Sequence, residues 1–442
     1  MTALGTGPRS GTGVKRRIAN LDGVRGLCAM VVVITHVAFS TGVVLGSESG
    51  PPQQGIWSIL AVGLEVGLGP FFILSGLLLY KPFARHALAG TAKPRLGPFF
   101  LRRGLRLMPG YWLLTAFCLL VLNFTSINSV WYVLRPLLLM QDYDFVWYAG
   151  MDPTWTIPTE AQFYIILPAL ALLMHKLARG VEDPARKVRR MMIPLAVLVL
   201  GGWAFAGYMH MAHLGPWPPE FWWPFSRIGL FAIGMGLALL SVRAEQSPDN
   251  IPALYRAARK RPNLFWLGAL ASYLIICSAP LGTAGTWDYG GPEFALLQHV
   301  GFLVFAFLLM VPLVAPKASS PLMDTALSNA PTRFLGRISY GIYLWHFVVM
   351  YLYFRSGSIF GAPPVPAALL IGKVGFWEML AVVVVGTIAI ATLSYYFFER
   401  PLLRFGERLI TKREAARAAS ATAGRPLPAQ EEKARERQTT SV

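Results

Sequence analysis

The feature that most constrains this chain is a series of apolar blocks, each about as long as a lipid bilayer is thick. A helix needs roughly 20 apolar residues to cross the hydrocarbon core, and about ten such blocks follow one another here. They cover approximately 26–45, 56–80, 107–125, 155–175, 191–212, 222–242, 262–280, 296–316, 336–354 and 376–398. Because backbone in lipid must satisfy its own hydrogen bonds, the blocks predict an all-α, polytopic membrane bundle of about ten transmembrane helices.

Composition supports this fold class. Hydrophobic residues make up 55% of the 442 residues and charged residues only 14%, whereas soluble domains average about 25% charge. The apolar residues form continuous blocks and not stripes of helical period, which indicates lipid on all sides. One apolar segment, at 131–140, is too short to span, so we expect an interfacial or re-entrant helix there.

The basic residues indicate how the chain is oriented. The net charge is +18, and Lys and Arg gather before the first block and in every second loop. These basic clusters occupy 15–17, 85–106, 176–190, 256–261, 317–337 and 404–413. The positive-inside rule then places both termini in the cytoplasm of a multi-pass cell-membrane protein. Orientation in the lipid bilayer explains the positive charge, so we expect no nucleic-acid partner.

The two ends of the chain differ from its middle in composition. We expect a disordered cytoplasmic N-terminus over 1–17, a membrane domain over 18–405 and a disordered cytoplasmic tail over 406–442. No cleavage site follows the first block, so we expect no removed signal peptide. The three cysteines fall in separate blocks, and no Cys or His cluster has zinc spacing, so we expect neither a disulfide nor a bound metal.

Arg25 and His36 are ionisable residues in the first apolar block, eleven positions apart. At about 100° per residue this spacing places both on one helix face, about 16 Å apart. Ionisable groups within a membrane helix usually face a protein interior or a watery cavity and mark function. The alternatives are a snorkelling anchor for Arg25 and a core histidine for His36. Asp22 can hold the Arg25 guanidinium or, with Asn20, cap the helix start.

Arg102, Arg103 and Arg106 lie in the second loop, just before the third block. Orientation explains part of this charge, but three guanidinium groups so close together also suit the phosphates of an anionic cytosolic ligand.

Two further blocks contain polar residues that could support chemistry. Glu160 begins the fourth block on the external side, where it can orient an imidazole, accept from a sugar hydroxyl, pair with a buried Arg or simply face solvent. Ser75 lies beside Gly76 in the second block and permits close helix approach. Its surroundings lack the nucleophile-elbow pattern, so we do not expect a catalytic serine.

Near the ninth block, Tyr343 fits an aromatic belt, and His346 is a second intramembrane histidine that serves either packing or catalytic support. Glu399 and Arg400 end the last block, where we expect an ion pair at the cytoplasmic mouth.

Six strings in this order resemble the acyltransferase-3 family of integral membrane acyltransferases over about residues 18–405. They are LDGVRG with the R-x10-H spacing, FFILSG, RRGLRLMP, WTIPTEAQFY, GRISYGIYLWH and FFERP. The resemblance implies about ten membrane helices, an acyl-coenzyme A donor on the cytosolic side and a hydroxyl acceptor at or beyond the outer face. The chain departs from the family pattern at Ala161, where many members have a second acidic residue, and at Pro158, where Ser is common.

We therefore expect a membrane O-acyltransferase that moves an acetyl group from cytosolic acetyl-CoA to a cell-envelope glycolipid or glycan, with no bound cofactor. The expected roles are catalysis by His36, with Glu160 and Asp22, donor binding by Arg25, Arg102, Arg103 and Arg106, and support by Ser75, Tyr343, His346 and Glu399. The alternatives are transfer to a small-molecule sugar such as a macrolide glycoside, and a proton-coupled transporter, although no internal repeat favours the latter.

Overall fold

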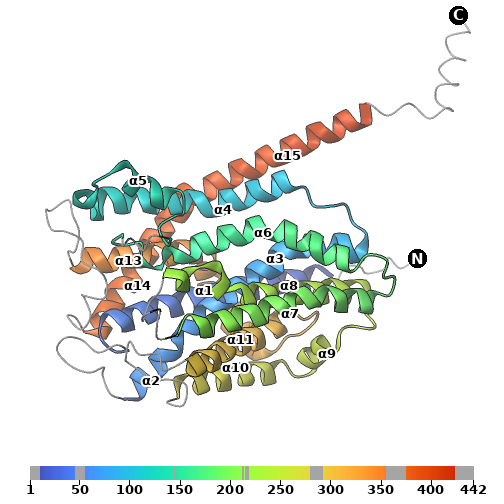
Figure 1. Ribbon diagram of the computed structural model, residues 1–442, viewed down its shortest axis with the longest axis horizontal. Helices are drawn as coiled ribbons and strands as arrows, with labels where there is room; N and C mark the ends of the chain where they lie inside the picture. The colour runs from blue at the N-terminus through green and yellow to red at the C-terminus, as the bar shows by residue number, and fades with distance from the viewer. Residues whose placement is uncertain are drawn as a thin grey trace, which may run out of the picture.

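The computed structural model describes residues 10–44, 55–143, 146, 148–211, 214, 219–278, 292–354 and 375–423, and within these ranges all regular structure is helical. Figure 1 shows a bundle whose long helices run side by side. In the described ranges, eight helical segments are long and apolar enough to cross a membrane. They are Ala19–Ser40, Ile56–Ala89, Leu96–Leu122, Asp152–Leu177, Pro184–Tyr208, Ile228–Gln246, Pro292–Val314 and Phe376–Ala416. The protein is therefore a multi-pass membrane protein.

These segments contain the long helices of the bundle. Their bounds are α1 (Ser10–Ser40), α3 (Gly69–Ala89), α4 (Leu96–Phe117), α6 (Thr156–Leu177), α7 (Pro184–Tyr208), α8 (Ile228–Gln246), α11 (Pro292–Val314) and α14 (Phe376–Leu393). Shorter turns extend four of them. Helix α2 (Ile56–Val62) and the 3₁₀ segment η1 (Gly63–Leu68) lead into α3, and η4 (Asp152–Trp155) leads into α6. A π-helical turn follows each of the other two, η2 (Cys118–Leu122) after α4 and η11 (Ser394–Glu399) after α14.

Two further helices occupy the predicted seventh and ninth blocks. Helix α10 (Pro262–Cys277) has 16 residues, and α13 (Ala330–Phe354) has 25 but contains Arg333 and Arg337 near its start. The all-helical prediction is thus confirmed, and most of the described residues of each predicted block lie on a helix. The remaining short helices are α5 (Val130–Leu137), α9 (Ala253–Lys260) and α12 (Pro321–Leu327). With eight residues, α5 matches the short helix predicted at 131–140.

Three helices begin well before the apolar blocks that predicted them. Helix α1 begins at Ser10, α4 at Leu96 and α7 at Pro184, against predicted starts at 26, 107 and 191. Their first turns contain Lys and Arg, which form helices readily but do not enter lipid. Hydropathy marks only the apolar part of such a helix and therefore places its start too late.

The tail is also more ordered than its composition predicts. Helix α15 (Arg400–Ala423) covers the first part of the segment predicted as disordered from 406, while residues 424–442 lie outside the described residues. It packs along α4 on the upper side of the bundle in Figure 1, and α15 tilts away from the other helices and ends toward the right-hand end of the view. The start of α1 lies at that same end, whereas α2 lies at the other.

Glycines allow the central helices to approach closely. Helix α1 packs on α13, and a Cβ added at Gly336 would collide with the backbone of Asp22. Helix α3 packs on α8 in the same way, since a Cβ at Gly234 would collide with the backbone of Ile73. Small residues drive close packing of membrane helices. The first of these contacts sets α1, with Arg25 and His36, directly against α13.

We expect Gly234→Val to weaken the α3–α8 contact, because the added methyl groups would force the two backbones apart. Overpacking of this kind lowers the free energy of unfolding by about 1–3 kcal/mol. The measurement is the thermal unfolding midpoint in detergent. Gly201→Val on α7 is the matched control, because a Cβ at Gly201 meets nothing within 4 Å. Equal midpoints for the two variants would contradict the close contact.

Candidate active site

Two adjoining cavities lie inside the bundle. The outer cavity has a volume of about 380 Å³ and is lined by His36, while the inner cavity has a volume of about 110 Å³ and is lined by Arg25. Leu68 and Phe72 line both cavities and so form the wall between them. Arg25, predicted to bind a donor, and His36, predicted to catalyse transfer, therefore line neighbouring cavities.

Only two of the three predicted donor-binding arginines on α4 line the inner cavity. Arg103 and Arg106 line the cavity together with Arg25. Arg102 instead contacts α15, with its Nε 3.4 Å from Glu407 Oε1 and its Nη2 3.8 Å from Glu414 Oε1. All three lie on α4 and not in a loop as predicted, because the helix begins at Leu96. Successive residues on a helix point about 100° apart, so Arg102 and Arg103 face different neighbours.

Glu160 lies in the inner cavity with Arg25, and the described lining of the His36 cavity does not include it. Its Oε1 accepts hydrogen bonds from Ser75 Oγ and from the Tyr164 hydroxyl, each at 2.6 Å. This placement favours one of the possibilities left open by the sequence, a carboxylate beside a buried guanidinium. Ser75 holds that carboxylate from α3.

Asp22 does not cap the start of a helix, because α1 begins twelve residues earlier at Ser10. Asn20, its predicted partner in capping, instead joins α1 to the region of α12. Ser328 Oγ donates to Asn20 Oδ1 at 2.5 Å, and Asn20 Nδ2 donates to Asp324 Oδ1 at 3.5 Å. The capping alternative was therefore wrong, and Asp22 remains one helical turn from Arg25.

The main feature of the outer cavity is a pair of histidines from α1 and α13. His36 Nδ1 lies 2.9 Å from His346 Nε2, and the ring centroids are 5.0 Å apart. His346 is completely buried, and its Nδ1 lies 3.2 Å from the Ile342 carbonyl oxygen. Phe347 packs edge-on against His36, with 4.8 Å between ring centroids.

These contacts fix the tautomers of both rings. The Ile342 carbonyl can only accept, so His346 Nδ1 is the donor and its Nε2 holds a lone pair when the ring is neutral. His36 Nδ1 must then donate to that lone pair. The remaining ring nitrogen of a neutral His36, Nε2, therefore has a lone pair available for a proton.

Tyr343 links α13 to the segment that enters α6. Its hydroxyl donates to the Pro153 carbonyl and lies 2.6 Å from Thr156 Oγ1, which can donate in turn. Tyr343 also lines the inner cavity. The Tyr343 side chain thus holds in place the segment 153–156, where Pro153 lines the outer cavity and Thr156 lines the inner one.

Glu399 and Arg400 diverge, so the predicted ion pair between them was wrong. Glu399 is buried in a π-helical turn and accepts from Ser394 Oγ at 2.9 Å. Arg400 lies over the Tyr396 ring, 5.5 Å from its centroid. Neighbouring residues on a helix point in directions too different for their side chains to pair.

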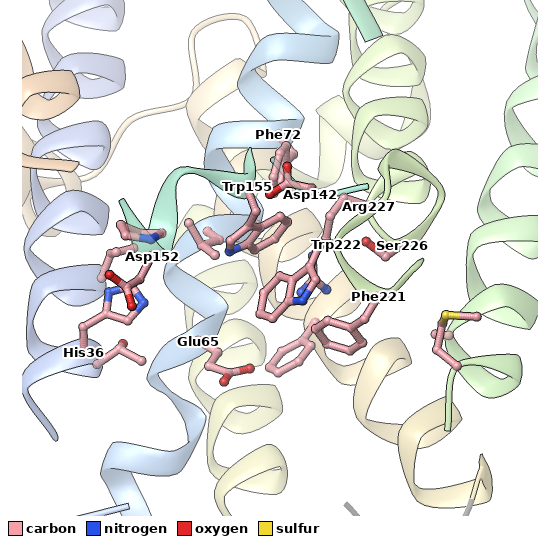
Figure 2. Close-up of a pocket in the computed structure, with 18 of the residues that line it drawn as sticks. His36, Glu65, Phe72, Asp142, Asp152, Trp155, Phe221, Trp222, Ser226 and Arg227 are labelled. Carbon is pink, nitrogen blue, oxygen red and sulfur yellow. The ribbon is translucent and has the colours of Figure 1, made fainter. Parts of the chain in front are cut away.

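Glu65, Asp152 and Arg227 also line the outer cavity, as Figure 2 shows, but sequence reasoning gave them no role. Glu65 and Arg227 fall inside the predicted blocks 56–80 and 222–242. Intramembrane ionisable residues usually have a function, so this signal was available in the sequence. Among the described residues, no group of three or more His, Cys, Asp and Glu could hold a metal ion.

Comparison with known proteins identifies the family of this bundle. The model of the acyltransferase-3 family, described as an acyltransferase domain, matches residues 18–398. Nodulation protein 10 of Rhizobium leguminosarum bv. viciae is 25% identical over 394 residues, which cover 82% of this chain and 89% of that protein. The peptidoglycan O-acetyltransferase OatA of Listeria monocytogenes is 23% identical over 411 residues, which cover 89% of this chain and 57% of OatA.

The family model covers most of the chain, so this protein belongs to the acyltransferase-3 family and is a membrane acyltransferase. The chain spans only a little over half the length of OatA.

Proposed function

We propose that this protein transfers an acetyl group from acetyl-CoA on the cytosolic side to a hydroxyl group of a cell-envelope glycan or glycolipid. The observation that most supports it is the His36–His346 pair, whose geometry leaves a basic nitrogen on His36 in the outer cavity. The name of the Listeria monocytogenes relative, peptidoglycan O-acetyltransferase OatA, supports a glycan acceptor.

The inner cavity supplies the donor site in this proposal. Arg25, Arg103 and Arg106 would bind the coenzyme A phosphates, because guanidinium forks match phosphate oxygens. The Leu68–Phe72 wall must open for the pantetheine arm to reach His36. The Arg25–His36 separation of about 16 Å is of the order of that arm's length.

His36 would act as the general base. Its Nε2 takes the proton from the acceptor hydroxyl while the hydroxyl oxygen attacks the thioester carbonyl carbon. The carbon–sulfur bond then breaks, an ester forms on the acceptor, and the coenzyme A thiolate leaves and takes up the proton as a thiol. A neutral imidazole suits this transfer near neutral pH.

This scheme requires both termini on the cytoplasmic side. The basic loops support that orientation, as does the position of the α1 start and the α15 end at one end of the bundle. A fluorescent protein fused after residue 442 should therefore fluoresce in the cytoplasm, and alkaline phosphatase at the same position should be inactive. The reverse result would exclude the orientation and the cytosolic donor together.

The activity itself is tested with purified protein in liposomes and acetyl-CoA labelled in the acetyl group. We expect label to appear in alkali-labile esters on extracted envelope glycans or glycolipids. A transporter would move a solute but leave the label on free donor, which would contradict the proposal.

The donor site predicts unequal effects of the α4 arginines. Arg106→Ala should raise the KM for acetyl-CoA about tenfold or more, because a hydrogen bond to a charged group contributes about 1.5–3 kcal/mol. Arg102→Ala should change it by less than about threefold, because Arg102 faces Glu407 and exposed ion pairs contribute about 0–1 kcal/mol. Steady-state kinetics at saturating acceptor measure both, and equal effects would contradict the assignment.

A further inference from the structure

An aromatic corner forms the wall of the outer cavity opposite His36. Trp155 and Trp222 have ring centroids 5.1 Å apart, and Phe221 packs edge-on against Trp222 at 5.1 Å. The Arg227 guanidinium carbon lies 5.3 Å from the centroid of Trp155 and 5.7 Å from that of Phe221. The corner is therefore an apolar aromatic surface with a cation at its edge.

One side-chain hydrogen bond ties this corner to α6, and two of its residues lie next to the starts of helices. Thr159 Oγ1 on α6 donates to the Trp222 carbonyl at 3.2 Å, and Arg227 immediately precedes α8. Trp155 ends the 3₁₀ turn that leads into α6. Among the described residues, Trp155 and Trp222 line the cavity, whereas Trp223 packs against Tyr143 with the two rings tilted by 47°.

Glu65 provides an exposed carboxyl group in the same cavity. It lies on η1, where a glycine-rich sequence turns the second span into a 3₁₀ helix. Short 3₁₀ stretches within a helix often mark functional positions. Figure 2 shows Glu65 between His36 on one side and the Trp222–Phe221 edge of the corner on the other.

Carboxyl groups outnumber guanidinium groups in the described lining. Asp142 and Asp152 join Glu65 there, against Arg227 alone. Burial raises the pKa of the Asp142 carboxyl to about 7, so it is partly neutral at neutral pH. Burial also lowers the pKa of His210, which disfavours the charged form of this imidazole. The balance opposes an anionic ligand and suits one that donates hydrogen bonds.

We propose that the aromatic corner and Glu65 form the acceptor subsite, and that it binds a hexopyranose that is neutral or carries an amino group, not an acidic sugar. This inference rests on the proposed function and names the acceptor's chemical class. The apolar face of the ring would lie on Trp222, and Glu65 and Arg227 would bind its polar substituents. A further hydroxyl would then face His36 across the cavity. The volume of about 380 Å³ is within the range of about 300–1,000 Å³ that small-molecule sites occupy.

The test uses the full chain in liposomes with acetyl-CoA and three probe acceptors, the methyl β-glycosides of N-acetylglucosamine, glucosamine and glucuronic acid. Transfer is measured as alkali-labile ester. We expect the first two to be acetylated with kcat/KM at least tenfold above the third. An octyl glycoside of N-acetylglucosamine, tested beside the methyl one, distinguishes a lipid-linked from a polymeric source of the same sugar by its KM.

Variants locate the subsite. Glu65→Gln should raise the KM for the N-acetylglucosaminide about tenfold or more, with the KM for acetyl-CoA unchanged. Trp222→Ala should also raise the KM for the N-acetylglucosaminide and leave the KM for acetyl-CoA unchanged. Glu378→Gln and Trp377→Phe are the matched controls, since both residues are exposed on α14 and neither lines the cavity. An unchanged acceptor KM in Glu65→Gln, or preferred transfer to the glucuronide, would overturn the inference alone. A wild-type protein that never consumes acetyl-CoA would overturn the proposed function as well.

Discussion

Replacing His36 with alanine should lower the rate of acetyl transfer by about 10²–10⁴-fold, the contribution typical of a positioned general base. His36 lines the outer cavity, and its Nδ1 is occupied by His346, so the variant removes the one ring nitrogen that the geometry leaves for the acceptor proton. The measurement is kcat for transfer of labelled acetyl groups in liposomes.

The control for this variant is His86→Ala. His86 lies near the end of α3, where its Nδ1 contacts the Thr91 carbonyl oxygen outside both cavities. It should transfer at the wild-type rate, and both proteins should elute from size-exclusion chromatography as folded wild type does. Full transfer by a folded His36→Ala protein would end the assignment of His36 as the base.

Replacing His346 should have the second-largest effect, although we do not expect it to touch the acceptor. Its Nε2 fixes the tautomer of His36, so His346→Ala leaves His36 free to present the wrong nitrogen. Loss of such an orienting group from a catalytic histidine lowers kcat by up to about 10⁴-fold in serine proteases. We expect a loss of at least about 10²-fold in kcat, with the KM for acetyl-CoA unchanged.

Two further variants separate orientation from packing. His346→Gln supplies an amide oxygen that can accept from His36 Nδ1, so it should recover part of the lost rate. The double variant His36→Ala/His346→Ala should be no slower than His36→Ala, because the two residues act as one unit. Additive losses, or equal rates for the alanine and glutamine variants, would show that His346 only fills space.

The sequence predicted the helical elements because lipid imposes a simple, local requirement on the chain. Each helix must present enough apolar residues in a row, and that property is visible in one dimension, as the blocks 26–45 and 376–398 illustrate. Helix starts were less accurate, since the basic first turns of α4 and α7 lie beyond the apolar stretch.

The Arg25–His36 spacing also followed from the sequence, because both residues lie on one helix of known geometry. Contacts between residues on different helices did not follow from the sequence. His36 and His346 are 310 positions apart in the chain and meet only because α1 packs against α13.

Only the tertiary structure decided how the charged residues divide between the two cavities. In the structure, Arg102 contacts Glu407, and Arg25 and Glu160 both line the inner cavity. Glu65 and the aromatic corner both line the outer cavity. The physical reason is that these contacts depend on the rotation of each helix about its axis. Close backbone contacts such as Gly336 on Asp22 set that rotation, and hydropathy along the chain does not encode it.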